Sequence, residues 1–181
     1  MILAIVLALA PAWAQYPTTP KDYYQFPLSP GEQAFLSGTM GELRSTHFHA
    51  GIDIKTKGIE GLKVYAAADG YISRIKITTG GYGHAIYLRH TNGTTSVYAH
   101  LRDFREDIQR KVLSTQYEEK SYEVDFYPLE ADFPVKRGDL IGWSGNTGSS
   151  HGPHLHFEIR DLNQQVLNPL KFHFPNVGRS N

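Results

Sequence analysis

The chain of 181 residues contains no cysteine. This absence excludes disulfide bonds and thiolate metal sites, so any bound metal must be held by nitrogen and oxygen ligands. An excess of one charge is also missing, because 18 basic residues face 18 acidic ones. The chain therefore lacks the excess of positive charge that is typical of nucleic-acid-binding proteins, and no nucleic-acid partner is expected. The length suits one domain.

The apolar run at residues 2–10 is too short to span a bilayer as a helix. Ala12 and Ala14 follow it with the spacing of an A-x-A cleavage site. We therefore expect residues 1–14 to be a signal peptide. The mature chain should then have no transmembrane span and should be exported, to the periplasm, the cell envelope or the medium.

Short apolar runs dominate the chain after residue 39, separated by turns such as Asp69-Gly70 and Asn92-Gly93. The strands predicted from these runs cover residues 51–54, 63–67, 71–77, 85–89, 94–100, 140–143 and 154–160. Many short strands with tight turns indicate a mostly β protein with a sandwich or barrel-like core.

One stretch departs from the strand pattern. Ile108 and Val112 are spaced by four residues, with Leu113 and Tyr117 beside them, which predicts an amphipathic helix over residues 103–120. Its apolar stripe is expected to pack on the sheet. A partner-binding helix is the alternative, without independent support.

The most informative motif is G-P-H-L-H-F-E at residues 152–158. Alternation places its apolar side chains on one face of a strand and His154, His156 and Glu158 on the other. The Cα atoms of the two histidines should lie roughly 7 Å apart. Both imidazoles can then reach one metal site, one to bind the ion and one to handle its water.

A second cluster contains His49 and Asp53. In a straight strand their Cα atoms would lie roughly 13 Å apart, so binding one ion requires a bend, which Gly51 can supply. With His156 the set is two imidazoles and one carboxylate. Three such ligands with an open fourth position are typical of catalytic zinc, and we expect one Zn²⁺ per chain.

His100 and His154 are expected to flank the open zinc position without binding the ion. One imidazole can accept a proton from the bound water, while the other stabilises the oxyanion or donates to the leaving amine. His47 and His151 lie inside the motifs and are candidates for contact with substrate or with the metal's outer shell. Structural or surface roles are expected for the remaining histidines: His84, His90 and His173.

Three motifs resemble, in spacing and order, the lysostaphin/LytM-type zinc endopeptidases. They are H-A-G-I-D at residues 49–53, Y-A-H-L at 98–101 and G-P-H-L-H-F-E at 152–158. The resemblance covers about residues 38–168. It implies zinc ligation by His49, Asp53 and His156, and catalytic roles for His100 and His154.

The resemblance also implies a fold and an activity. The fold is a small, mostly antiparallel, lipoyl-like barrel-sandwich with a groove over the zinc. The activity is hydrolysis of peptide bonds in peptidoglycan stem peptides or cross-bridges. The bond cleaved stays open among glycyl bridges, D-alanyl–diaminopimelate crosslinks and other peptides.

The expected organisation is a signal peptide at residues 1–14, an extended lead-in at 15–37, the peptidase domain at 38–172 with an insertion at about 102–133, and a tail at 173–181. The insertion, which includes the predicted helix, is a departure from the family. No tyrosine stands shortly before His49, where some lysostaphin-like enzymes place a transition-state stabiliser. Arg44 is a candidate for substrate contact or for a structural ion pair.

Two other functions compete with the enzyme hypothesis. Some family members have lost ligands and activate other cell-wall hydrolases, but all five active-site positions are filled here. Residues 68–72 and 135–141 also resemble lipoyl- and biotinyl-carrier sequences. A carrier needs a lysine in a D-K-A or M-K-M context, and the chain has no such tripeptide.

Overall fold

The computed structural model describes residues 18–179, so the predicted signal peptide lies outside the described residues. The elements in chain order are β1 Ala34–Gly38, β2 Ile52–Lys55, β3 Lys63–Tyr65, β4 Gly70–Ile77, β5 His84–His90, β6 Thr95–Ala99, β7 Leu101–Phe104, α1 Glu106–Glu119, β8 Val124–Phe126, β9 Pro134–Val135, β10 Leu140–Ser144, β11 His154–Arg160, β12 Val166–Leu167, the 3₁₀ helix η1 Pro169–Phe172 and β13 Val177–Arg179. Within residues 18–179 no helix is long and apolar enough to cross a membrane.

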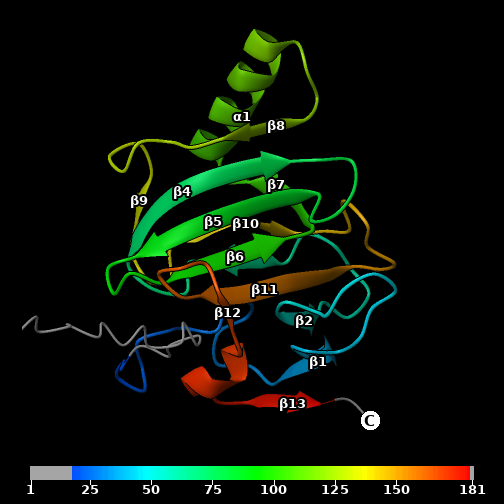
Figure 1. Cartoon of the computed structure of the whole chain (residues 1–181), viewed down its shortest axis with the longest axis vertical. Helices are drawn as coiled ribbons and strands as arrows, with labels where there is room; N and C mark the ends of the chain where they lie inside the picture. The colour runs from blue at the N-terminus through cyan, green and yellow to red at the C-terminus, as the bar shows by residue number, and fades with distance from the viewer. Residues whose placement is uncertain (1–17, 180–181) are drawn as a thin grey trace, which may run out of the picture.

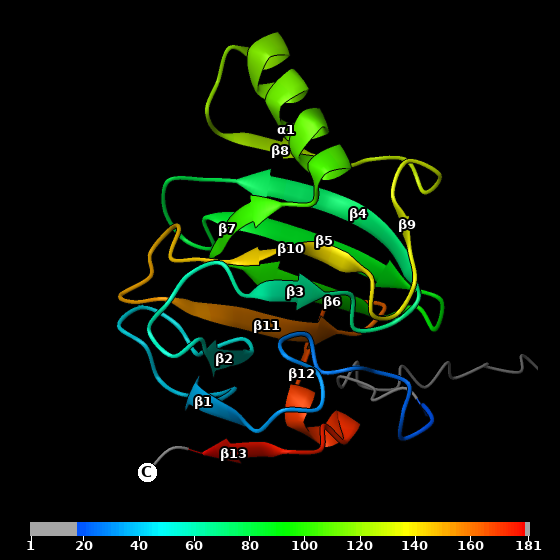
Figure 2. The same ribbon diagram turned by 180° about the vertical axis from the view of Figure 1, so that it is seen from behind.

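The strands form a large sheet that faces a small one (Figures 1 and 2). The ten-stranded sheet has the order β13-β1-β2-β11-β6-β5-β4-β8, with β12 on β11 and β9 on β4, and the three-stranded sheet has the order β3-β10-β7. All pairs are antiparallel except β1 with β13. The predicted mostly β fold with one α-helix is confirmed, and each strand predicted from alternation is present.

The apolar core fills the space between the two sheets. On β11, Leu155, Phe157 and Ile159 point into this core and are fully buried. Burying each of these large side chains contributes on the order of 2 kcal/mol. Because side chains alternate along a strand, His154 and His156 must point to the opposite, outer face of the large sheet.

The segment before residue 38 belongs to the same core. Tyr24, Phe26 and Leu28 are buried within it, and β1 pairs with β2. At the other end of the chain, β13 pairs with β1. The folded unit therefore extends beyond the boundaries expected at residues 38 and 172, because apolar side chains on both sides of them are needed to complete the core.

Helix α1 confirms the predicted helix and extends away from the large sheet next to its edge strand β8 (Figure 1). It buries Ile108, Val112 and Thr115, whereas Leu113 and Tyr117 are 44% and 82% exposed. Fewer apolar side chains of the helix pack on the sheet than predicted, because a helix at the edge of a sheet contacts it along a narrow side only.

His90 is part of a buried polar cluster at the end of β5. Its Nδ1 atom lies 3.2 Å from the carbonyl oxygen of Asp69, and its Nε2 atom lies 2.8 Å from the Ser96 hydroxyl. The Ser96 hydroxyl is hydrogen-bonded to Tyr98, which accepts from the backbone of Ala67. Burial lowers the pKa of His90 to about 4, so this histidine has the structural role expected and is neutral at pH 7.

The buried state of His90 predicts a specific loss of stability in acid. The unfolded chain binds a proton on this residue below a pH of about 6.5, while the folded chain does not until about pH 4. Unfolding free energy should therefore fall as pH falls through this window, by up to roughly 3 kcal/mol. Between pH 7 and pH 5, His90→Gln should lose roughly 2 kcal/mol less stability than the wild type in urea titrations.

His173→Asn is a matched control, because His173 is exposed and asparagine tolerates its left-handed backbone. This variant should retain the wild-type pH dependence. An identical pH dependence in His90→Gln and the wild type would show that burial does not keep His90 neutral.

Candidate metal centre

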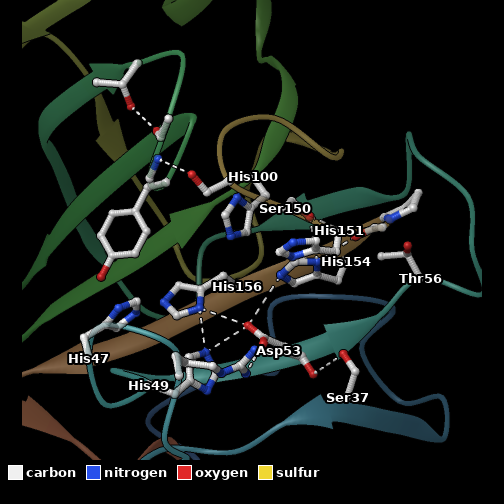
Figure 3. Close-up of a pocket in the computed structure, with 18 of the residues that line it drawn as sticks. Ser37, His47, His49, Asp53, Thr56, His100, Ser150, His151, His154 and His156 are labelled. Atoms are coloured by element: carbon white, nitrogen blue, oxygen red, sulfur yellow. Dashed lines mark hydrogen bonds and ion pairs between the residues drawn. The ribbon is translucent and has the colours of Figure 1, made fainter.

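Three adjacent strands bring the predicted site residues together. Strand β11 lies between β2 and β6, with His156 opposite Asp53 on one side and opposite Ala99 on the other. His100 directly follows β6, and His154 begins β11. All five predicted site residues gather at one side of the sheet, as the close-up in Figure 3 shows for each of them.

His49 reaches the site through a bend at Gly51, as expected from the sequence. The same glycine permits a close approach of the backbone: a Cβ atom at residue 51 would lie 2.2 Å from the carbonyl oxygen of Phe157. Such a distance is far below van der Waals contact. Gly51 is therefore required for the packing of this segment against β11.

The three predicted ligands present a compact triangle of donor atoms. His49 Nε2, His156 Nδ1 and Asp53 Oδ1 lie 3.0 Å from one another along all three sides. Tetrahedral zinc with bonds of about 2.0–2.2 Å requires donor atoms roughly 3.3–3.5 Å apart. The triangle therefore fits such an ion to within a few tenths of an ångström.

The opposite nitrogen of each ligand histidine is bound to an acceptor. His49 Nδ1 lies 2.9 Å from the Thr39 carbonyl oxygen, and His156 Nε2 lies 2.9 Å from Glu158 Oε1. Each of these nitrogens must therefore carry the ring proton when the imidazole is neutral. In that state the three atoms of the triangle are all acceptors with lone pairs and none carries a proton. They repel one another unless a cation lies between them.

The titration behaviour of the metal-free site reflects this need for a cation. Burial alone would lower the pKa of His156, but the carboxylates of Asp53 and Glu158 outweigh burial and raise that pKa to about 9. Burial would likewise raise the pKa of Asp53, but the facing imidazoles of His154, His156 and His49 hold it well below its ordinary value. When no metal is bound, a proton on His156 partly offsets the repulsion between the clustered acceptor atoms.

The two histidines expected to be catalytic are oriented by backbone carbonyls. His100 Nδ1 lies 2.8 Å from the Thr147 carbonyl oxygen, and His154 Nδ1 lies 2.8 Å from that of Gly152. Their Nε2 atoms are left for chemistry, and that of His154 lies 3.5 Å from Asp53 Oδ1. The two rings are adjacent, with centroids 4.7 Å apart.

His100 occupies the point where the chain passes from the large sheet to the small one. Its backbone is left-handed, with φ at 58°, a strained conformation that is frequent at functional sites. Burial, and then the neighbouring His154, lowers the pKa of its imidazole to about 4. His100 is therefore neutral at pH 7 and able to accept a proton.

Tyr82 and Arg160 complete a shell that sequence reasoning did not identify. Glu158 is fully buried, and it accepts hydrogen bonds from the Tyr82 hydroxyl and from Arg160 Nε as well as from His156. Tyr82 also stacks on the His156 ring, with centroids 5.2 Å apart. Tyr82 reaches the site from the glycine-rich turn at residues 80–83, which belongs to none of the motifs.

A groove of about 1390 Å³ lies over the triangle. His47 and His151, both exposed, line it together with Tyr82. Arg44 also lines it, but its Nη2 atom donates to Asp53 Oδ2 at 2.8 Å, so it forms the ion pair that was one of its two expected roles. The groove is large and open enough for an extended peptide.

The chain is similar to several known proteins. The model of peptidase family M23 matches residues 47–117 and 115–169. The chain is 36% identical over 133 residues to the DD-carboxypeptidase/endopeptidase Mpg of Neisseria meningitidis, a match that covers 74% of the chain and 24% of that protein. It is 31% identical over 99 residues to the peptidoglycan DD-endopeptidase ShyC of Vibrio cholerae, covering 55% of the chain and 17% of that protein.

Among solved structures, the catalytic domain of lysostaphin from Staphylococcus simulans is similar, with a TM-score of 0.57 and 26% identity. That similarity covers 77% of the chain and 92% of the lysostaphin domain. By contrast, the chain spans about a quarter or less of the length of Mpg and ShyC.

Proposed function

The chain belongs to peptidase family M23, and from this premise we propose that it is a zinc-dependent endopeptidase that hydrolyses peptide bonds in peptidoglycan stem peptides or cross-bridges. The observation that carries the proposal is the triangle of acceptor atoms on His49, Asp53 and His156, which holds no proton when both imidazoles are neutral, because their outer nitrogens then carry the ring protons. Two imidazoles and one carboxylate are the donor set of many catalytic zinc sites.

In this proposal the chain's own residues divide the work. His49, Asp53 and His156 bind one zinc ion, which would lower the pKa of a water to near 7 and polarise the scissile carbonyl. His100 and His154, whose Nδ1 atoms are held by backbone carbonyls and whose Nε2 atoms point away from those carbonyls, take a proton from the nucleophile and return it to the leaving amine. The carbonyls of Thr147 and Gly152 hold these imidazoles in the required tautomer.

An inactive activator of other hydrolases is the second candidate function. The completeness of the site argues against it, since all five polar groups are present and each histidine is oriented by an acceptor. The names of Mpg and ShyC support a substrate in the cell wall. With the predicted signal peptide, they also support a location in the cell envelope.

Metal content and muropeptide analysis test the proposal together. The purified protein should contain one zinc per chain, should release peptides from purified cell walls, and should lose this activity with a chelator and regain it with zinc. Mass spectrometry of the released muropeptides identifies the bond. A folded protein that binds no zinc at neutral pH would overturn the enzyme proposal, and a zinc-loaded protein without turnover would favour the activator.

Removing the charge of Glu158 should weaken zinc binding without removing a ligand. Glu158→Gln places an amide where Arg160 now donates, and it deprives His156 of an anionic partner. Loss of such an outer partner typically lowers metal affinity 10–100-fold. Competition with a chelating dye measures the dissociation constant.

Two further variants keep this prediction testable if Glu158→Gln folds poorly. Tyr82→Phe removes one hydrogen bond to Glu158 and leaves the charge, so it should weaken zinc binding by less. Glu119→Gln changes an exposed glutamate at the end of α1, which does not line the groove, and should bind zinc as the wild type does. Wild-type affinity in Glu158→Gln would show that this carboxylate does not support the metal.

A further inference from the structure

The charged groups that line the groove are mostly positive. They comprise one carboxylate and five cations: Asp53, Arg44, Lys55, Lys57, Arg74 and Lys76. A bound zinc ion would add to this excess. A cleft lined by one sign of charge attracts ligands of the opposite sign. The groove is therefore suited to a peptide that carries negative charge.

The uncompensated part of this charge lies at one end of the groove. Arg44 donates to a ligand carboxylate at 2.8 Å, and Arg74 donates to Asp125 at 2.6 and 2.7 Å. Lys55 and Lys57 are exposed, and within residues 18–179 no carboxylate lies within 4.0 Å of either ammonium group. The free positive charge thus lies at the end of β2 and in the turn that follows.

Strand register places Lys55 beside the proposed proton-transfer group. Lys55 follows Asp53 by two residues on β2, so both point to the groove side of the sheet, and it pairs directly with His154. Cβ atoms of such cross-strand partners lie roughly 5 Å apart. Figure 3 shows the next residue, Thr56, on the His154 side of the cluster and His47 on the opposite side.

We propose that Lys55 determines specificity by binding a free carboxylate on the substrate residue next to the scissile bond. The inference rests on the proposed peptidase function. It assigns as substrates acidic crosslinks in which the residue that supplies the leaving amine keeps its neighbouring carboxylate, as in a D-alanyl–diaminopimelate bond. Uncharged glycyl bridges lack this group. A lysine ammonium is a compact charge that suits a single carboxylate of variable orientation.

The test uses zinc-loaded protein and three probes. Two are purified dimeric muropeptides with a D-alanyl–diaminopimelate crosslink, in which the carboxylate next to the crosslinked amine is either free or amidated. The third is pentaglycine. The wild type should cleave the free-carboxylate dimer with a kcat/KM at least roughly 10-fold above that of the amidated dimer, the scale of a hydrogen bond between charged groups. This preference should shrink at high salt.

Lys55→Met removes the charge and keeps the aliphatic stem. It should lower kcat/KM for the free-carboxylate dimer by roughly 10-fold, mainly through KM, and leave the amidated dimer and the zinc content unchanged. Lys111→Met, which changes an exposed lysine on α1, is the matched control and should behave as the wild type.

The outcomes separate this inference from the function on which it rests. Equal cleavage of both dimers by the wild type, an equal loss on both dimers in Lys55→Met, or preferred cleavage of pentaglycine would overturn the role of Lys55 and leave a peptidase. A zinc-loaded wild type that cleaves none of the three probes would overturn the proposed function and the inference together.

Discussion

Asp53→Ala is expected to remove bound zinc and peptidase activity together. The change takes one of three donors from the triangle and exposes the Arg44 guanidinium, now 2.8 Å from the Asp53 carboxylate, to the ion. Both effects disfavour the metal, so affinity should fall by well over the 10–100-fold typical of a lost outer partner. Elemental analysis after dialysis and turnover of cell-wall peptides measure the two losses.

The fold itself should survive this substitution, because the apolar core lies on the opposite face of the sheet. Circular dichroism and the urea midpoint of the metal-free protein check this point. Asp125→Ala, which removes a carboxylate that is not a predicted ligand, should retain zinc. Full zinc occupancy in Asp53→Ala would mean that the ion is bound elsewhere.

His154→Ala and His100→Ala are expected to separate metal binding from turnover. Neither imidazole belongs to the triangle, so both variants should keep most of their zinc. Each removes a group placed to move a proton or to stabilise developing charge, and turnover should fall by about 10²–10⁴-fold. Zinc content and kcat, measured on the same preparations, give the comparison.

His156→Ala is the matched control, because it removes the neighbouring histidine of the same strand and should lose zinc. His154 faces Asp53 Oδ1 at 3.5 Å, so its exclusion from the ligand set is open to a direct challenge. Equal loss of zinc in His154→Ala and His156→Ala would make His154 a ligand and reverse the assigned roles.

Residue type and spacing were sufficient to predict the cluster of site histidines and Asp53. Alternation along residues 154–160 determines which side chains face the core, and therefore which face the groove. The predicted strands at residues 51–54 and 94–100 carry Asp53 and His100. Both pair with β11 although neither is its neighbour in the chain, so the resemblance to a known family, and not chain order, brought these residues together. The composition alone required nitrogen and oxygen ligands. These arguments depend on the type of side chain at each position, which the sequence gives directly.

The orienting partners could not be predicted in the same way. Thr39, Thr147 and Gly152 act through backbone carbonyls, whose direction depends on loop conformation and not on residue type. Tyr82 reaches the site from a turn far away in sequence. The exposure of Tyr117 depends on how α1 meets the sheet edge, which helical periodicity does not specify.

The ligands proposed for zinc lie on β11 and on β2 with the segment before it, so a bound ion would be coupled to the alignment of these two strands. A slip of β11 by one residue would turn both of its histidines into the apolar core and bring Leu155 and Phe157 to the groove. Zinc, as a ligand that would bind only one alignment, would select that alignment from its competitors during folding. A molecule that carries the ion would therefore be one in which β2 and β11 have paired correctly, so zinc occupancy would report the quality of a preparation as well as its capacity for catalysis.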